Sequence, residues 1–121
     1  MYRIRFYETA SGFSDILEFL ISLRNQAMTS KDARIQYKQV ARYIYLLQKE
    51  GTNLPVDIAK YLSDDIWELR PGNNRVFFFY HDNGTYILLH HFRKKSQKTP
   101  KKEIQKAISE MKDYISRKEK I

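Results

Sequence analysis

The chain has 121 residues and contains no cysteine. The absence of cysteine excludes a disulfide scaffold, a thiol nucleophile and a thiolate metal site, and it fits a reducing compartment. No apolar run approaches the roughly 18 residues of a membrane-spanning helix. The first residues alternate apolar and basic side chains, and the long hydrophobic region of a secretory signal does not follow them. These absences predict a soluble cytoplasmic protein with no membrane partner.

Glycine and proline are also scarce, with four and three residues. No segment rich in them divides the chain and no internal repeat is visible, so we expect a single domain over residues 1–121. A glycine-rich phosphate loop is missing, which argues against an enzyme that uses nucleoside triphosphates. The chain does hold enough apolar material for a core, because 42% of its residues are hydrophobic and 14% are aromatic.

The charge of the chain is uneven. There are 22 Lys and Arg residues against 14 Asp and Glu, a net charge of +8. Residues 93–121 hold 11 basic and 4 acidic residues, a net of +7, whereas residues 1–92 hold 11 and 10, a net of +1. The densest run has six cations and no acid: Arg93, Lys94, Lys95, Lys98, Lys101 and Lys102. Such a run beside a core suggests a polyanionic partner, with a solvated tail as the alternative interpretation.

The first half of the chain predicts one strand and two helices. Residues 2–7 alternate with period two, which is typical of a strand. Residues 11–27 show helical spacing, with Ser11 or Ser14 as the cap. A second helix starts at Thr29 or Ser30, runs to about Glu50 and ends at Gly51, and the two helices form an antiparallel hairpin. Residues 52–64 are ambiguous, and the spacing of their leucine and isoleucine residues suggests a short helical turn.

The second half predicts a sheet and a final helix. Residues 66–70, 75–81 and 85–93 have strand patterns and are joined by turns, the second of which contains Asn-Gly. They form a three-stranded antiparallel meander. Thr99 as cap and Pro100 at the first helical position open a last helix that runs to about Ser116. The fold class is therefore α+β, with one antiparallel sheet packed against helices.

Strand alternation indicates which side chains project together. Between residues 66 and 70 we expect Trp67 and Leu69 to be buried, and Glu68 and Arg70 to be exposed. Arg75 shares a face with two phenylalanines, and it should be open to solvent or paired, because burying an unpaired guanidinium is costly.

Those two phenylalanines, Phe77 and Phe79, have two interpretations. They form an open aromatic face edged by arginines that stacks bases and grips phosphates. Alternatively, they pack under the C-terminal helix, which is the commoner arrangement for large apolar side chains.

The basic run is expected to lie near the same turn. If the meander pairs as described, the strand that ends at Arg93 delivers Lys94, Lys95 and Lys98 to the end of the sheet that holds the turn from Arg70 to Arg75. Lys101 and Lys102 occupy the first turn of the last helix, where cations are unfavourable for the helix but suit an anion site.

A metal site is not indicated. Asp64, Asp65 and Glu68 are too few for a two-metal nuclease. His90 and His91 are adjacent in a strand and face opposite ways, so they do not share a metal. We therefore expect no metal and no cofactor.

RNA offers a reaction that needs no metal. The ribose 2′-OH attacks its own phosphate and leaves a 2′,3′-cyclic phosphate, so the protein need only orient the chain, neutralise charge and move protons. Arginines and lysines are abundant for the charge, while the possible general bases are few: Glu68, His90 or His91.

Several of these motifs together resemble the HigB-type, phage-derived branch of the RelE/ParE toxin superfamily. The resemblance covers about residues 60–110. The motifs that carry it are Ile66-Trp67-Glu68-Leu69-Arg70, Arg75-Val76-Phe77-Phe78-Phe79-Tyr80, Leu88-Leu89-His90-His91-Phe92-Arg93-Lys94-Lys95-Ser96-Gln97-Lys98-Thr99-Pro100 and Glu103-Ile104.

The resemblance implies an endoribonuclease toxin of a type II toxin–antitoxin system that cuts mRNA in the ribosomal A site without a metal. It also implies a HigA-type antitoxin with a helix-turn-helix domain, through which the toxin reaches operator DNA. The phosphate-contacting arginines of the family would fall on Arg70 and Arg75, and its basic residues after the last strand on Lys94 and Lys95. The RelE type has lysines where this chain has Ile66 and Glu68, and a tyrosine near the C-terminus that has no assigned counterpart here. The general base therefore stays open: either Glu68 or His90 replaces it, or charge stabilisation carries most of the rate.

The sequence thus gives a leading hypothesis and two alternatives. In the leading one, Arg70 and Arg75 stabilise the scissile phosphate, and Lys94 and Lys95 act with them. The RNA-binding residues around them would be Arg93, Lys98, Lys101 and Lys102. The first alternative is a ParE-like toxin that inhibits DNA gyrase, because the fold alone cannot separate the two activities. The second is a basic module without catalysis that binds an acidic antitoxin or nucleic acid.

Overall fold

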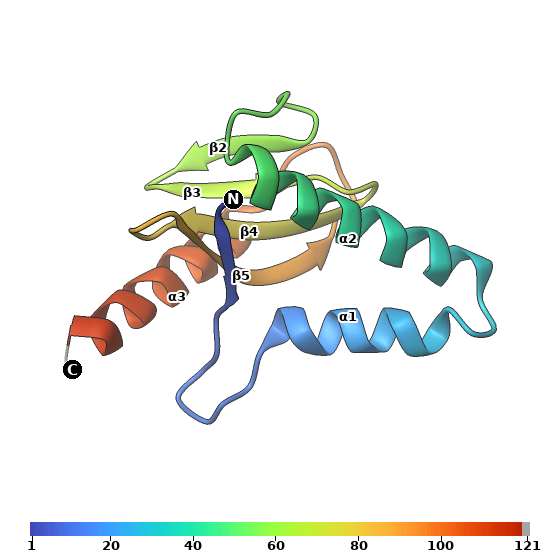
Figure 1. The fold of residues 1–121 in the computed structure, drawn as a ribbon, viewed down its shortest axis with the longest axis horizontal. Coiled ribbons are helices and arrows are strands. Elements are labelled where there is room, and N and C mark those ends of the chain that lie inside the picture. The colour runs from blue at the N-terminus through green and yellow to red at the C-terminus, as the bar shows by residue number, and fades with distance from the viewer. Residues whose placement is uncertain (120–121) are drawn as a thin grey trace.

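The computed structural model describes residues 1–119 and has the predicted α+β architecture. The predicted helical hairpin, meander and last helix are all present (Figure 1). In chain order the elements are β1 (Arg3–Phe6), α1 (Asp15–Gln26), α2 (Lys31–Glu50), β2 (Ala59–Ser63), β3 (Ile66–Leu69), β4 (Asn74–Tyr80), β5 (Thr85–Arg93) and α3 (Lys101–Glu119).

Five strands form one mixed sheet in the order β1-β5-β4-β3-β2. The predicted antiparallel meander is confirmed by β3, β4 and β5. Two further strands lie at its edges: β1 pairs with β5 in parallel, and β2 pairs with β3 antiparallel. The sheet is therefore larger than the meander alone, and it is not purely antiparallel.

Residues 52–64, which were ambiguous in the sequence and whose spacing suggested a short helical turn, include a strand that was not predicted. One turn closed by the Pro55 carbonyl does exist, but Ala59–Ser63 then forms β2. The β2–β3 turn is made by Asp64 and Asp65, whose φ angles are +51° and +69°. Two-residue hairpin turns with positive φ favour Asn-Gly, so the Asp-Asp pair gave no hairpin signal.

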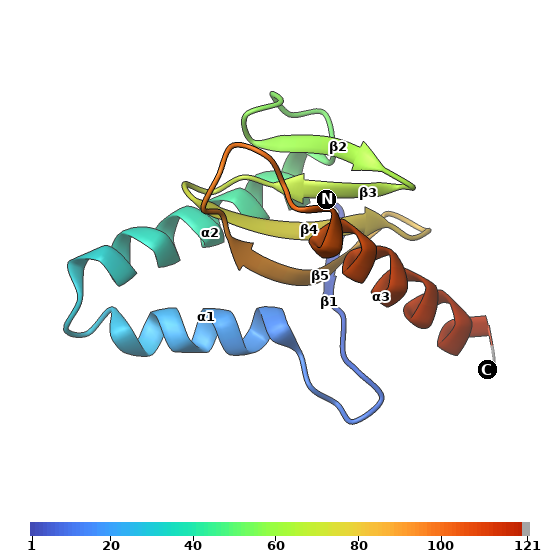
Figure 2. The same cartoon turned by 180° about the vertical axis from the view of Figure 1, so that it is seen from behind.

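The molecule has three layers. The α1–α2 hairpin covers one face of the sheet, and α3 covers the other (Figures 1 and 2). On the hairpin side, Val76, Phe78 and Leu88 pack against Ile16 and Leu47. On the α3 side, Phe77 and Phe79 pack with Ala107 and Met111. The interpretation of Phe77 and Phe79 as core residues is confirmed, and the open aromatic face is wrong.

The starts of α1 and α2 follow the capping residues of the sequence, whereas the Thr99 hydroxyl, predicted to cap the last helix, donates to Glu68 instead. The Ser14 and Ser30 hydroxyls accept hydrogen bonds from Leu17 N and Ala33 N at 3.2 and 3.1 Å, so Ser14 rather than Ser11 is the cap of α1. Gly51 ends α2 with a φ of +63°, and a Cβ there would lie 2.8 Å from the Tyr2 ring. Within residues 1–119 no helix is long and apolar enough to cross a membrane.

A bulge in β5 determines where the two histidines point. The pairing changes from Val76↔His91 to Phe78↔Leu88, so β5 holds one residue more than β4 over this stretch. The extra residue places both Leu89 and His90 on the α3 face. His91 lies on the opposite face, beside α1, as the alternation predicted.

Candidate functional site

A buried cluster of one carboxylate and two guanidiniums occupies the α3 face of the sheet, where β3 and β4 meet their connecting turn. We call Glu68, Arg70, Arg75 and Thr99 the arginine–carboxylate cluster. Glu68 Oε2 lies 3.5 Å from Arg70 Nε and 3.9 Å from Arg75 Nε. The Thr99 hydroxyl donates to Glu68 Oε1 at 2.8 Å. Glu68 is only 2% exposed, so the prediction of an exposed Glu68 is wrong.

Burial of Glu68 follows from what surrounds it. Its direct partner across the sheet is Phe77, which is fully buried on the α3 face. A buried carboxylate requires positive or hydrogen-bonding partners. The two arginines and Thr99 supply them from three different segments, a combination that strand alternation alone does not reveal.

Arg75 takes the paired alternative that the sequence left open. Its Nη1 donates to the carbonyl oxygens of Gly72 and Asn74, both at 2.9 Å. Burial lowers the pKa of this guanidinium, while the charge of Glu68 opposes the shift. Its side chain is 5% exposed. Arg75 therefore holds the β3–β4 turn in place and is enclosed in this structure.

Arg70 is the more accessible of the two arginines. Its side chain is 24% exposed, and Nη1 donates to the Val56 carbonyl at 3.3 Å. Its Nε is buried and has no hydrogen-bond partner, because the contact to Glu68 is an ion pair without hydrogen-bond geometry. The buried Nε is out of reach of a ligand, and only the exposed part of the guanidinium can donate to a phosphate oxygen.

The basic run lies at the end of the sheet beside this cluster. We call residues 93–102 the basic loop. Lys94 N donates to Asn73 O at 2.8 Å, and Arg93 pairs with Asn74 across the sheet, so the loop begins at the β3–β4 turn as predicted. Five of its six cations are exposed and Lys94 is half-buried. Thr99 then joins the far end of the loop to Glu68.

Helix α2 supports the same turn from the hairpin side of the sheet. Gln36 Oε1 accepts hydrogen bonds from Asn74 Nδ2 at 3.0 Å and from Arg93 Nη1 at 3.1 Å. Gly72 has a φ of +61°, and a Cβ there would lie 2.7 Å from Gln39 Oε1. The turn, the end of β5 and α2 are therefore fixed relative to one another.

His90 is enclosed between the sheet and α3. Its ring nitrogens lie 2.6 Å from Glu110 Oε1 and 3.0 Å from Glu103 Oε1, and the ring packs on Phe77 with centroids 4.8 Å apart. The residue is 1% exposed. In this arrangement His90 ties α3 to the sheet and does not face solvent.

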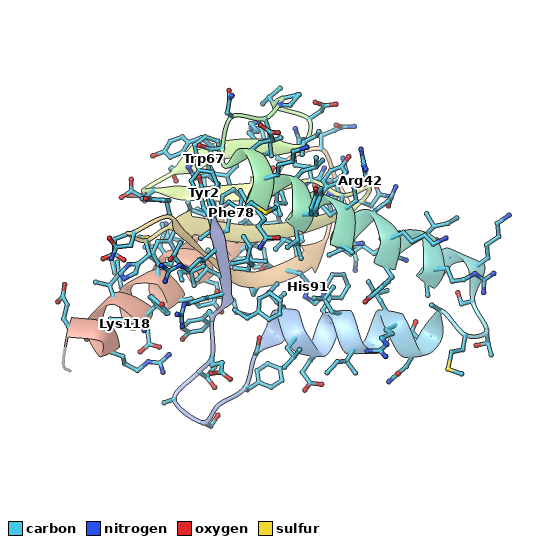
Figure 3. All side chains as sticks on the ribbon, in the orientation of Figure 1. Tyr2, Arg42, Trp67, Phe78, His91 and Lys118 are labelled. Atoms are coloured by element: carbon cyan, nitrogen blue, oxygen red, sulfur yellow. The ribbon has the colours of Figure 1, made fainter. Side chains whose placement is uncertain are left out.

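His91 forms a different kind of pair on the opposite face. Its Nδ1 lies 2.6 Å from Asp15 Oδ1, and its backbone N–H donates to the same oxygen at 2.9 Å. The ring stacks on Phe19 with centroids 3.7 Å apart, and Figure 3 shows His91 between α1 and α2. Burial alone would raise the pKa of Asp15, but the bonds from His91 lower it below its ordinary value.

The His91–Asp15 pair was missed from sequence because the two residues lie 76 positions apart. The His91 side chain is 27% exposed, and within residues 1–119 its Nε2 has no hydrogen bond or ion pair. A carboxylate at Nδ1 favours the tautomer whose Nε2 can accept a proton. Of the three bases considered from the sequence, His91 is the one with an accessible ring nitrogen.

A mixed-charge cleft lies elsewhere on the molecule and contains none of the expected site residues. It has a volume of about 440 Å³ and lies between β1 and the C-terminal half of α3, with Arg5, Tyr114 and Lys118 in its lining. Nearby, burial and a 2.6 Å hydrogen bond to Asp113 raise the pKa of Tyr7 to about 12. These contacts join β1 to α3.

The structure therefore divides the expected site residues into three groups. Arg70 and Arg75 both lie beside Glu68 Oε2, and the basic loop is next to these three residues. His90 is enclosed under α3. Within residues 1–119 no group of three or more His, Asp or Glu side chains could hold a metal ion.

The fold and this surface define a small α+β protein with a cationic sheet end. A model of the family described as Phage derived protein Gp49-like (DUF891) matches residues 28–112. The match covers more than half of the sequence, and the chain therefore belongs to the Gp49-like family. No curated protein sequence resembles the chain closely enough to count as a match.

Solved structures resemble the fold without close sequence similarity. One is a chain of the YoeB-YefM complex from Staphylococcus aureus, with a TM-score of 0.50 and 8% identity. The alignment covers 79% of this chain and 99% of that chain. At this identity the likeness concerns the fold alone.

Proposed function

We propose that the protein is the toxin of a type II toxin–antitoxin system and an endoribonuclease that cuts mRNA on the ribosome without a metal. One observation carries this proposal: six cations of the basic loop lie at the same sheet end as Arg70, whose side chain is partly exposed. Fold similarity to a chain of the YoeB-YefM complex supports it.

The cations would bind the RNA backbone in this proposal. Arg93, Lys94 and Lys95 neutralise the charge that develops on the scissile phosphate beside His91, and Arg70, Lys98, Lys101 and Lys102 contact flanking phosphates. Arg75 positions the turn that carries Arg70, and it reaches a phosphate itself only if its guanidinium leaves Glu68 and the turn carbonyls.

We assign proton transfer to His91 rather than to Glu68 or His90, because both of those are enclosed. Asp15 orients the His91 ring, and Nε2 accepts the proton of the attacking 2′-OH. Arg93 lies two residues further along β5, on the same face, where Gln36 holds it. The phosphate nearest to the reacting hydroxyl would then be the one that Arg93 contacts.

The partners follow from the same proposal. A cognate antitoxin, of the HigA type with a helix-turn-helix domain, would neutralise the toxin and link it to operator DNA. Both proteins would act in the cytoplasm, where the ribosome is. The HigB type is thus proposed within the Gp49-like family.

Primer extension on mRNA from a reconstituted translation reaction tests the activity. We expect cuts within codons in the A site, and a loss of about a hundredfold or more in the cleavage rate for His91→Asn, as is typical for a general base. Lys112→Gln, an exposed cation on α3, is the matched surface control and should cut normally. A protein that leaves all messages intact, or His91→Asn with full activity, would contradict the assignment.

One observation favours a non-nuclease alternative. Glu68, Arg75 and His90 are all buried, so three of the residues that the sequence predicted to act in catalysis are shielded from a substrate. A ParE-like toxin that inhibits DNA gyrase would not need them to be open. A supercoiling assay separates the two functions, because inhibition of gyrase without RNA cleavage would replace the nuclease. Growth arrest on expression of the chain alone would exclude a module that only binds an antitoxin.

A further inference from the structure

The outer face of α2 carries charge of one sign, although the sequence analysis treated residues 1–92 as nearly neutral. Five cations of this helix are exposed: Lys31, Arg34, Lys38, Arg42 and Lys49. The buried residues of the helix are Ala33, Val40 and Leu47. At 3.6 residues per turn the two sets lie on opposite sides of the helix. We call the five cations the α2 stripe.

The spacing of the stripe is regular. Arg34, Lys38 and Arg42 follow one another at intervals of four residues, which is about 6 Å along the helix axis. The whole 20-residue helix is about 30 Å long. A straight helix thus presents a row of charges whose separation is comparable to that of successive phosphates along one nucleic-acid strand. Figure 3 shows Arg42 on the side of α2 that is turned away from α1.

A merely solvated helix face would mix charges of both signs. Like charges four residues apart destabilise a helix, and alternating Glu and Lys would stabilise it. The two acids of α2, Asp32 and Glu50, lie near its ends and outside the row. None of the ion pairs formed within residues 1–119 involves α2. Arg34 Nη1 donates to the Ala27 carbonyl at 2.9 Å, whereas the side chains of the other four cations have no hydrogen bond or ion pair within residues 1–119. The helix therefore retains an unfavourable arrangement that leaves these four cations available to a ligand.

The stripe is continuous with the candidate site. Gln39 occupies the space that a Cβ at Gly72 of the β3–β4 turn would fill, and Gln36 binds Arg93 at the start of the basic loop. Both glutamines lie between the stripe and the buried side of α2. A polyanion that crosses the sheet end can therefore extend along the helix without crossing an acidic surface of α2.

We propose that the α2 stripe binds the sugar–phosphate backbone of double-helical RNA, as a surface separate from the one that would cut mRNA. A rigid, evenly spaced row suits a repeating backbone, which is recognised by shape and charge. An acidic protein is the competing ligand, because Ile35 and Tyr45 are also exposed on this side of α2. It is less well matched, because protein interfaces are depleted in lysine, which supplies three of the five cations. The proposal rests on the proposed function only in the choice of RNA among polyanions.

Fluorescence anisotropy with a labelled, blunt RNA duplex of about 16 base pairs tests the proposal. The variant Lys38→Gln/Arg42→Gln removes two exposed cations whose side chains have no hydrogen bond or ion pair within residues 1–119. We expect roughly tenfold weaker binding, and a slope of log affinity against log salt that is smaller by roughly 1.4–1.8. The matched control Lys106→Gln/Lys112→Gln removes two exposed cations from α3 and should leave both values nearly unchanged.

A structural role predicts a different result. If the stripe served the helix, its removal would lower the melting temperature, whereas we expect the variant to melt at the same temperature or higher because repulsion is relieved. Equal losses in the variant and the control, or no loss in either, would overturn the proposal. The proposal would also fail if the stripe variant lost affinity only for DNA of the same sequence or only for poly-L-glutamate, and kept its affinity for the RNA duplex. Duplex binding needs no cleavage, so a protein that binds through the stripe but never cuts RNA would overturn the proposed nuclease alone.

Discussion

Glu68 is the residue whose environment the sequence described least well and whose role is now clearest. It compensates two guanidiniums and fixes the end of the basic loop through Thr99. Buried carboxylates that serve as bases need access to substrate, and this one has none. We therefore treat Glu68 as a residue that positions Arg70 and Arg75.

Replacing Glu68 by glutamine tests this role. The amide has nearly the same shape but leaves the Arg75 guanidinium buried without a counter-charge. Breaking a buried ion pair in this way costs about 3–5 kcal/mol, so we expect a loss of that size in the free energy of unfolding. Urea titration followed by circular dichroism measures it. Asp57→Asn, at an exposed acid, is the control and should change stability by less than about 0.5 kcal/mol.

At the scale of elements, the sequence predicted every segment whose signal is local. Strands 66–70, 75–81 and 85–93 follow from period-two patterns and turn residues, and α2 follows from Ser30 and Gly51. The parallel pairing of β1 with β5 is long-range and leaves no mark on either strand. β2 was missed because an Asp-Asp turn does not resemble a hairpin turn.

The same reasoning explains what was predicted of the candidate site. The basic loop could be placed at the β3–β4 turn because the order of the three meander strands follows from their period-two patterns and turn residues. Burial of Glu68 and Arg75 depended on Thr99 and on the position of α3, which the pattern does not give. The His91–Asp15 pair depended on the packing of α1 against β5.

The β2–β3 turn offers a test of the missed element. Asp65 has a φ of +69°, a conformation that costs a non-glycine residue about 1 kcal/mol. We expect Asp65→Gly to stabilise the protein by about that amount, and to raise the melting temperature by roughly 3–6 °C. Asp57→Gly removes the same charge at a position without a positive φ and should give no increase. An equal rise in both variants would assign the effect to charge.

The attachment of α1 to the sheet should depend on pH. The pKa of Asp15 is lower in the folded chain than its ordinary value of 3.8. The stabilisation is therefore complete above the unfolded pKa and is lost as pH falls through the lower, folded pKa. We expect Asp15→Asn to be less stable near neutral pH, and to lose less further stability than the wild type as the pH falls below about 4.

Urea titrations over that pH range make the comparison. Glu18→Gln, at an exposed acid in the same first turn of α1, should follow the wild-type curve. Parallel curves for Asp15→Asn and the wild type would mean that the Asp15–His91 contact does not stabilise the fold.

For the whole molecule, the distribution of charge matters more than its sum. A division of the sequence at residue 92 places nearly all of the net charge in the last quarter. That division hides the α2 stripe, because acids elsewhere in residues 1–92 cancel its charge in the count but not in space. The folded chain instead has two cationic surfaces, the basic loop and the stripe, joined by the β3–β4 turn.

If the two surfaces contact different phosphates, their contributions to RNA binding should add. The probe is an RNA hairpin with a single-stranded tail, long enough to reach both surfaces. We expect Lys94→Gln/Lys95→Gln and Lys38→Gln/Arg42→Gln each to reduce the salt slope by roughly 1.4–1.8, since each contact releases roughly 0.7–0.9 ions. The quadruple variant should show the sum of both reductions, and its loss in binding free energy should equal the sum of the two separate losses.

Additivity is the informative part of this experiment. A quadruple variant no weaker than either double variant would mean that both pairs of cations serve one set of phosphates, and the separate duplex-binding surface would have to be withdrawn. An affinity that does not change with salt in the wild type would contradict any account based on phosphate contacts. Additive losses, with unchanged binding in Lys106→Gln/Lys112→Gln, would show that the chain binds RNA through two separate surfaces, the basic loop and the α2 stripe.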